Sequence, residues 1–256
     1  MKALVTGASS GIGREIAKCL SNRGYDLILV ARNKEKLEAL QKELKTKSKI
    51  VIMDLSGEQK AKELYVQTRR DDIDILVNNA GFGLCGDFVE LELSRELEMI
   101  ETNVKALHIL TKAFLRDFIK KDKGYILNVA SSAGFLPGGP LMATYYATKS
   151  YVLSFTNSIW YELKKNKSNV HISVLTPGPV DTNFNKVANV KFGVKAMKAD
   201  VVAKYAVDSM FKHKREIVPG KKIKLTKFFT RLLSDKTLLK TTYKIQRKKL
   251  VKKSDE

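Results

Sequence analysis

Short apolar runs that alternate with longer helical patterns constrain the fold of this chain more than any other feature. Strands are predicted at residues 3–6, 26–32, 49–54, 73–79, 125–130 and 170–175, with a short edge strand at 216–219; helices begin near residue 11 and cover 33–45, 57–70, 94–121 and 143–165. Several runs are apolar at consecutive positions, which is typical of parallel strands covered on both faces. The alternation predicts an α/β fold with a doubly wound, mainly parallel Rossmann-type sheet and helices on both faces. Ligands of such sheets bind beyond the carboxyl ends of the strands.

Length and composition fit one domain with a basic extension. Of the 256 residues, 44% are hydrophobic, which is enough for a sizeable core. We expect a dinucleotide-binding and catalytic domain at 1–220 and an amphipathic extension at 221–256. The two cysteines, Cys19 and Cys85, lie in dissimilar contexts and favour a reducing, cytoplasmic setting over a disulfide framework. The chain opens on a strand pattern and has no apolar run of ~18 residues, so neither a signal peptide nor a spanning helix is expected.

A glycine-rich turn, T-G-x-x-x-G-x-G, joins the first predicted strand to the first helix. Glycine permits φ > 0 and a close approach of backbone to phosphate, while the helix start adds free N–H groups and the positive end of its dipole. We therefore predict a dinucleotide phosphate site formed by Gly7, Ser9, Ser10, Gly11, Ile12 and Gly13. A tight turn without a ligand is the alternative, because the spacing differs from the commoner G-x-G-x-x-G fingerprint.

A tyrosine–lysine pair lies about 140 residues further on, in Tyr145-Tyr146-Ala147-Thr148-Lys149. Residues four apart share a helix face, so Tyr145 and Lys149 can act together. Moving a tyrosine pKa from about 10 to about 7 requires about 4 kcal/mol, which a lysine cation and an oxidised nicotinamide could supply together. Tyr146, three residues before Lys149, shares the same face, and spacing alone leaves both tyrosines open.

These motifs together resemble those of the short-chain dehydrogenase/reductase family. The glycine turn, Asn78-Asn79-Ala80-Gly81 after the fourth strand, and Y-x-x-x-K follow one another in family order over about residues 1–220. The resemblance implies a Rossmann-type domain, a nicotinamide cofactor and no metal. It also selects Tyr145 as the proton donor to a carbonyl oxygen and gives Lys149 the nicotinamide ribose and the task of lowering the tyrosine pKa.

The resemblance extends to further site residues. It implies that Asn103 holds a water for proton relay and that a serine at the end of the fifth strand binds the substrate oxygen. A glycine three residues later favours Ser131 for that serine, whereas the family distance to the tyrosine favours Ser132; we prefer Ser131. The remaining cofactor contacts implied by the resemblance are Asp54, Leu55, Asn79, Ala80, Gly81, Pro177, Gly178, Val180 and Thr182, besides Asn103, Tyr145 and Lys149 themselves.

The end of the second strand indicates which nicotinamide cofactor is used. A carboxylate there would bind a ribose 2′-hydroxyl and repel a 2′-phosphate, but this chain has Ala31-Arg32-Asn33. The guanidinium fork of Arg32 suits a phosphate, so NADP(H) is favoured over NAD(H). The alternative is that Arg32 is a solvated residue at a helix start.

The region corresponding to the family's variable substrate-covering segment, at about 182–198, is rich in apolar residues. It contributes Phe184, Phe192, Val194 and Met197, and Leu136, Leu141 and Met142 can add to them. We infer a small-molecule carbonyl or alcohol substrate that is bulky or apolar. His108 and His171 lack acid or ligand partners in the sequence and are interpreted as structural.

The last quarter of the chain carries much of its net charge of +20, since residues 191–256 hold 20 Lys and Arg against 6 Asp and Glu. From residue 221 to 250 the pattern is amphipathic, so the segment can lie on an anionic membrane or pack its apolar face on the body or a second subunit. Packing is preferred. Nucleic acid is not an expected partner, because no known binding module is present.

The combined expectation is an NADP(H)-dependent carbonyl reductase or alcohol dehydrogenase. Two alternatives stay open: a 3-oxoacyl thioester reductase, and a non-catalytic NADP-binding regulator held by its tail. The set Asn103, Ser131, Tyr145 and Lys149 argues against the regulator. Family resemblance further implies a homodimer or homotetramer that pairs through two long helices, and a cytoplasmic location with peripheral membrane contact as a further possibility.

Overall fold

The molecule is built on one seven-stranded parallel sheet. The structure, a computed structural model, describes residues 1–182, 184 and 196–248. The strands are β1 (Lys2–Thr6), β2 (Asp26–Ala31), β3 (Ser48–Ile52), β4 (Ile75–Asn78), β5 (Gly124–Val129), β6 (Val170–Leu175) and β9 (Glu216–Ile217). Their order is β3-β2-β1-β4-β5-β6-β9, and every pairing is parallel. The predicted doubly wound α/β fold is confirmed, including the short edge strand.

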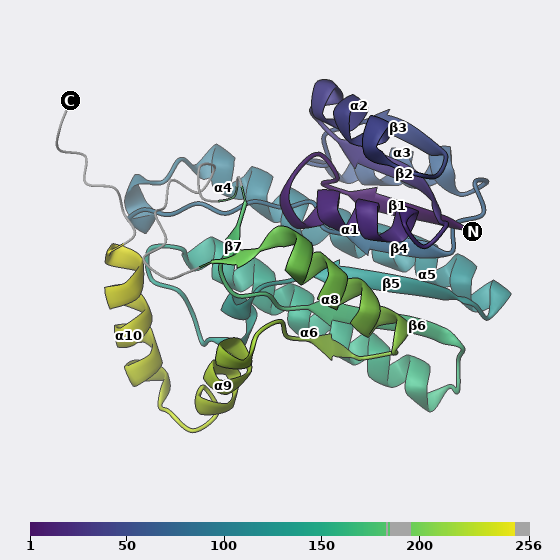
Figure 1. Cartoon of the computed structure of the whole chain (residues 1–256). Coiled ribbons are helices and arrows are strands. Elements are labelled where there is room, and N and C mark those ends of the chain that lie inside the picture. The colour runs from purple at the N-terminus through teal and green to yellow at the C-terminus, as the bar shows by residue number, and fades with distance from the viewer. Residues whose placement is uncertain (183, 185–195, 249–256) are drawn as a thin grey trace.

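Helices cover both faces of the sheet, as Figure 1 shows. On one face lie α1 (Gly11–Ser21), α2 (Lys34–Glu43) and α8 (Ala199–Phe211), and on the other lie α3 (Glu58–Thr68), α5 (Leu107–Lys121) and α6 (Ala143–Lys165). Successive residues of β1 point to opposite faces of the sheet. Ala3 and Val5 pack in the core beneath α1, α2 and α8, and Leu4 packs in the core beneath α3, α5 and α6. Consecutive apolar residues are therefore required, since neither face of the sheet meets water.

The long helix predicted at 94–121 is interrupted, and to that extent the prediction was wrong. It divides into α4 (Leu93–Ile100), a π-helical turn η2 (Glu101–Ala106) and α5. The buried Asn103 lies in this turn and bonds the backbone of Phe82 on a neighbouring loop. Single π turns often occur at functional sites, and one extra residue per turn is not visible in a periodicity of 3.6.

Three short elements lie near the carboxyl edge of the sheet. They are η1 (Phe88–Glu90), η3 (Ser132–Phe135) and the two-residue strand pair β7 (Val180–Asp181) with β8 (Met197–Lys198). The helix α8, which follows β8, was not predicted from the sequence. Within the predicted substrate-covering segment, Phe192 and Val194 lie outside the described residues.

The basic extension forms two helices, α9 (Lys221–Phe229) and α10 (Asp235–Arg247), at the lower left of Figure 1. The predicted packing holds for α10, whose buried residues Leu238, Thr242 and Gln246 recur every four positions. In α9, no residue is buried. None of the helices in the described ranges is both long and apolar enough to cross a membrane.

The core face of α5 should carry a large share of the folding free energy. Phe114 is 1% exposed and packs edge-on against Tyr65 with a centroid distance of 5.3 Å. We predict that Phe114→Ala lowers the free energy of unfolding by about 3–5 kcal/mol, because it removes buried area and leaves a cavity. The matched control is Phe88→Ala at a position that is 63% exposed, where we expect a change within about 0.5 kcal/mol. Urea denaturation measures both; equal losses would contradict the assignment of the core.

Candidate active site

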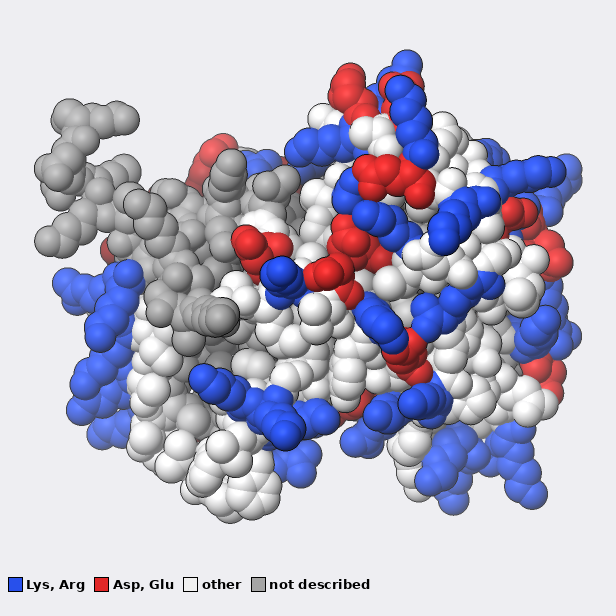
Figure 2. Space-filling model, in the orientation of Figure 1, with Lys and Arg blue, Asp and Glu red and all other residues white. Residues whose placement is uncertain are grey.

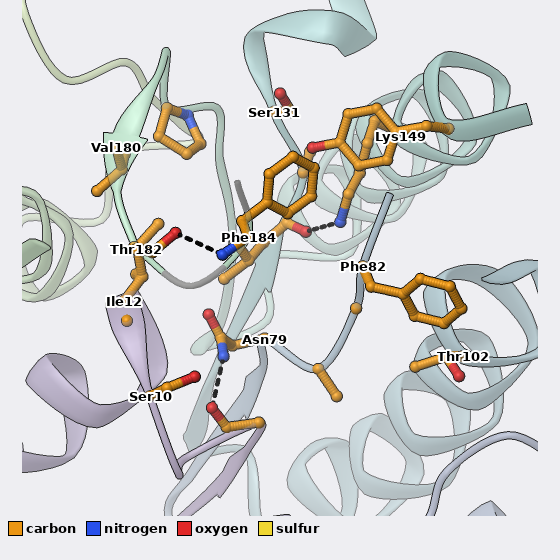
Figure 3. Close-up of a pocket in the computed structure, with 18 of the residues that line it drawn as sticks. Ser10, Ile12, Asn79, Phe82, Thr102, Ser131, Lys149, Val180, Thr182 and Phe184 are labelled. Carbon is orange, nitrogen blue, oxygen red and sulfur yellow. Dashed lines mark hydrogen bonds between the residues drawn. The ribbon is translucent and has the colours of Figure 1, made fainter. Parts of the chain in front are cut away.

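A cavity of about 410 Å³ opens at the carboxyl ends of the sheet strands. It receives residues from the glycine turn, from the loops after β2 to β6, and from α6. Figure 3 shows Ser10 and Asn79 toward one end of the cavity and Ser131 and Lys149 toward the other. The sequence-predicted residues that line it are Gly7, Ser9, Ser10, Gly11, Ile12, Arg32, Asp54, Leu55, Asn79, Ala80, Gly81, Ser131, Tyr145, Lys149, Pro177, Gly178, Val180 and Thr182.

The glycine turn has the backbone that a phosphate site needs. Gly7 and Gly11 adopt φ of +65° and +56°, in the left-handed region that favours glycine. Gly13 does not line the cavity. A Cβ at Gly13 would come within 2.3 Å of the Asn79 side chain and 2.5 Å of the Gly7 carbonyl oxygen. Gly13 therefore permits close packing of α1, while Gly7 and Gly11 leave backbone N–H groups free to meet an anion.

Hydrogen bonds fasten this turn to the loop after β4. The Thr6 hydroxyl accepts from the backbone N–H groups of Asn79 and Ala80, both at 3.0 Å. The Asn79 amide donates to the carbonyl oxygens of Thr6 and Gly7 at 3.1 and 3.2 Å (Figure 3). These bonds join the glycine turn to the loop after β4, about seventy residues further along the chain, on one side of the cavity.

The far end of the cavity, beyond β2 and β3, is lined by charged side chains. Arg32 pairs with Asp54 at 3.3 Å and with Glu98 at 3.2 Å, and its side chain remains 60% exposed. Lys36 and Asn33 line the same end and were missed in the sequence. The signal for Lys36 was present, because it lies four residues after Arg32 at the start of α2.

At the other end, three predicted residues meet. Tyr145 and Ser131 line the same end of the cavity, with the Ser131 hydroxyl near the phenol. The Lys149 ammonium lies 5.9 Å from the centre of the Tyr145 ring and donates to the Val129 carbonyl oxygen at 3.0 Å. Ser132 also lines the cavity, but the serine near the phenol is Ser131.

Burial decides the protonation of this group. It raises the pKa of Tyr145 to about 12, against the opposing effect of the Ser131 hydrogen bond. It also lowers the pKa of Lys149 to about 8. The direction for the tyrosine is opposite to that expected from the sequence, because desolvation disfavours the tyrosinate. At neutral pH the phenol therefore keeps its proton and the lysine keeps its charge.

The two candidate tyrosines have different partners. The Tyr146 hydroxyl accepts a hydrogen bond of 2.6 Å from the side-chain amide of Gln246 on α10. Both tyrosine rings line the cavity, as does Gln246. The serine near the Tyr145 phenol is Ser131, which agrees with the choice made by family resemblance, whereas the Tyr146 hydroxyl is bonded to Gln246. No sequence signal singled out Gln246, since its position depends on how the tail folds back.

Asn103 lies behind the cavity and does not line it. Its side-chain oxygen accepts from the Phe82 N–H at 3.0 Å, and its amide donates to the Phe82 carbonyl oxygen at 2.9 Å and to the Thr148 hydroxyl at 3.1 Å. These bonds join η2 to the loop after β4 and to α6. The water-holding role implied for Asn103 stays a prediction.

The wall beside Tyr145 is apolar. Phe184 packs against the Tyr145 ring with a centroid distance of 5.3 Å. The same cluster contains Cys85, Ala133, Leu136, Leu141, Met142 and Tyr146. Met197 does not line the cavity, because it pairs in β8 with Val180.

The histidines take no part in the cavity. His108 bonds the Tyr151 hydroxyl at 2.6 Å, and His171 stacks on His213 at 3.5 Å. Neither lines the cavity. Among residues 1–182, 184 and 196–248, no group of three or more His, Cys, Asp or Glu could hold a metal ion.

Comparison with known proteins agrees with this geometry. A model of the short chain dehydrogenase family matches residues 1–192. The chain is 33% identical to a 3-oxoacyl-[acyl-carrier-protein] reductase of Haemophilus influenzae over 187 residues, 72% of this chain and 76% of that protein.

Two solved structures extend the comparison to most of the chain. A short-chain dehydrogenase from Sphingobium yanoikuyae in complex with NADPH superposes with a TM-score of 0.80 at 28% identity, covering 91% of this chain and 95% of the other. A bulky-bulky ketone specific alcohol dehydrogenase from Comamonas testosteroni gives 0.76 at 27% identity, covering 90% and 92%. With the family's glycine turn and tyrosine–lysine pair lining one cavity, this chain belongs to the short-chain dehydrogenases, a family of oxidoreductases.

Proposed function

We propose that this protein is an NADP(H)-dependent carbonyl reductase that reduces bulky, largely apolar ketones or aldehydes, or oxidises the corresponding alcohols. The observation that carries the proposal is the convergence of Tyr145, Ser131 and the buried ammonium of Lys149 on one cavity. The apolar cluster around Phe184 and Met142 supports a bulky apolar substrate. The relative specific for bulky ketones supports the same class.

The residues of this group divide the chemistry among them. The nicotinamide supplies or accepts the hydride when bound. In reduction, Tyr145 transfers its phenolic proton to the carbonyl oxygen while that oxygen is held by the Ser131 hydroxyl. The tyrosinate left behind would be stabilised by the Ser131 hydroxyl and by the Lys149 ammonium. The phenol of Tyr145 holds its proton at neutral pH, as this direction requires, but its raised pKa makes it a weaker acid, so Ser131 and Lys149 must stabilise the tyrosinate as the proton leaves.

The cofactor preference rests on the end of β2. The cavity there offers the cations of Arg32 and Lys36, which suit a 2′-phosphate. The one nearby carboxylate in the lining, Asp54, is already paired with Arg32. The floor formed by Gly7, Gly11 and Asn79 fits the pyrophosphate. The NADPH bound by the Sphingobium relative supports the same choice.

A second candidate, a 3-oxoacyl thioester reductase, is favoured by the Haemophilus relative. The net charge of +20 suits an acidic carrier protein. Assaying acetoacetyl-coenzyme A beside a set of aryl and alicyclic ketones separates the two functions. A thioester reductase should turn over acetoacetyl-coenzyme A far faster than any of the ketones. A regulator without activity would turn over no carbonyl compound at all.

Assembly and location complete the proposal. A homodimer or homotetramer would pair through α5 and α6, whose outer faces expose Ile119, Tyr151 and Tyr161. The expected location is the cytoplasm, with part of the population on membranes through the tail. Figure 2 shows an uncharged bulge at the lower edge, where Figure 1 has α9, with Lys and Arg beside it.

The first test removes the phenolic proton. Tyr145→Phe should lower kcat/KM for ketone reduction by about 1000-fold, because general acid catalysis contributes roughly 100- to 10000-fold. NADPH affinity, followed by cofactor fluorescence, should change little. The matched control is Tyr161→Phe, on the same helix but 54% exposed, which should keep wild-type activity. Reduction retained by Tyr145→Phe would refute the assignment.

The second test concerns the 2′-phosphate. Arg32→Asp should lower kcat/KM with NADPH by about 10- to 100-fold and raise it with NADH, because a cation near the phosphate becomes a carboxylate. Lys34→Asp makes a like charge change two residues away at a side chain outside the cavity, paired with Glu38. Its cofactor preference should match the wild type. Rates followed at ~340 nm, the reduced nicotinamide band, decide the matter; unchanged preference in Arg32→Asp would exclude Arg32 from the phosphate site.

The third test addresses the membrane. In the tail, Leu225, Phe228, Phe229, Leu232 and Leu233 are 47–66% exposed among lysines. Apolar side chains inserted between basic residues bind anionic lipid in a salt-sensitive way. The protein should sediment with phosphatidylglycerol vesicles at low salt and much less with phosphatidylcholine. Phe228→Ser with Leu232→Ser should weaken sedimentation, whereas Phe88→Ser, an exposed phenylalanine elsewhere, should not; no sedimentation at low salt would end the proposal.

A further inference from the structure

The C-terminal helix contributes a buried amide to the substrate side of the cavity. In α10, Leu238, Thr242 and Gln246 face inward, and most of the other side chains of the helix are exposed. The Thr242 hydroxyl donates a hydrogen bond of 2.8 Å to the Leu238 carbonyl oxygen of the same helix. Gln246 is 2% exposed and lines the cavity that Tyr145 also lines.

The two ends of the Gln246 amide differ in their partners. Its Nε2 donates to the Tyr146 hydroxyl oxygen at 2.6 Å. Its Oε1 is buried and has no hydrogen-bond partner among the described residues. A buried carbonyl oxygen without a donor costs about 1–3 kcal/mol. Because Gln246 lines the cavity, a ligand bound there would supply the donor that this oxygen lacks.

The surroundings make this oxygen selective. Gln246 is bonded to Tyr146, which belongs to the apolar cluster that also contains Met142 and Phe184, and all four residues line the cavity. In mostly apolar cavities, a few polar groups set the orientation of the ligand. The Tyr145 and Tyr146 rings lie 6.2 Å apart, so the amide beside Tyr146 faces a part of the substrate away from the reacting carbonyl.

We propose that Gln246 is a substrate-recognition residue whose Oε1 accepts a hydrogen bond from a hydroxyl or N–H group remote from the carbonyl. The inference rests on the proposed function and narrows its substrate class. The preferred substrates are bulky apolar ketones that carry one hydrogen-bond donor at the end opposite the carbonyl. Gln246 positions the substrate and does not take part in the proton transfer by Tyr145.

Matched ketone pairs test the inference. Each pair shares one skeleton and differs only by a hydroxyl remote from the carbonyl, as para-hydroxybenzylacetone differs from benzylacetone; alicyclic pairs complete the panel. With NADPH, the wild type should show a KM about 10-fold lower for the hydroxylated member of the best pair, because one hydrogen bond to a buried acceptor contributes about 1–1.5 kcal/mol. In Gln246→Met the KM advantage should vanish. The kcat for the ketone without the hydroxyl should stay within about two-fold, because the substitution leaves Tyr145 and its proton transfer unchanged.

The matched control is Thr242→Val, on the same buried face but outside the cavity. It should keep the preference for the hydroxylated ketone. The melting temperature of Gln246→Met should fall only slightly, because the gain from removing an unmet buried oxygen offsets part of the cost of leaving the buried Tyr146 hydroxyl without its partner. A clear fall in melting temperature with unchanged preference would show a structural glutamine and overturn the inference.

The remaining outcomes separate the inference from the proposed function. Reduction of ketones by the wild type without any preference for hydroxylated members overturns the role of Gln246 and leaves the reductase in place. An equal preference for the hydroxylated ketones in the wild type and in Gln246→Met likewise overturns the role of Gln246 and leaves the reductase in place. Failure to reduce every ketone and thioester overturns both.

Discussion

The burial of the Lys149 ammonium is the constraint on which the rest of the site depends. An ammonium under a phenol ring is held only if a backbone acceptor meets it, and the Val129 carbonyl oxygen at the end of β5 does so. That bond fixes the distance between α6 and the sheet edge. Thr156, two turns further along α6, accepts from the Asn128 amide at 3.0 Å and fixes the same helix a second time. Tyr145, one turn before Lys149, is thereby delivered to Ser131.

The same burial sets the electrostatic character of the site. Desolvation disfavours every charged form, so it pushes the tyrosine toward the neutral phenol and the lysine toward the neutral amine. When the tyrosine loses its proton, the tyrosinate and the Lys149 ammonium attract each other, and this attraction offsets part of the desolvation cost of both charges. In the proposed proton transfer, the Lys149 ammonium would thus interact more strongly with the developing tyrosinate than with the neutral phenol. Interactions that are stronger in the transition state than in the ground state accelerate a reaction.

The parts of the fold and site that could be predicted from the sequence are those encoded locally. The seven sheet strands and the glycine turn follow from apolar runs and from residues that tolerate φ > 0, such as Gly7 and Gly11. The pKa direction of Tyr145 was missed, because burial is a tertiary property that spacing does not report. The π turn around Asn103 and the arrival of Gln246 were missed for the same reason, since both depend on contacts with distant segments.

The tail illustrates how one amphipathic sequence can serve two surfaces. Its apolar residues recur at helical spacing in both helices, yet α10 turns Leu238 inward whereas α9 leaves Phe228 outside. The difference lies in what each helix meets: α10 has the open side of the cavity to cover, while α9 touches the body through the Lys227–Glu216 ion pair and through Ile223, which packs close to Gly178. Because Gly178 lines the cavity, α9 contacts the wall of the site as well as the body.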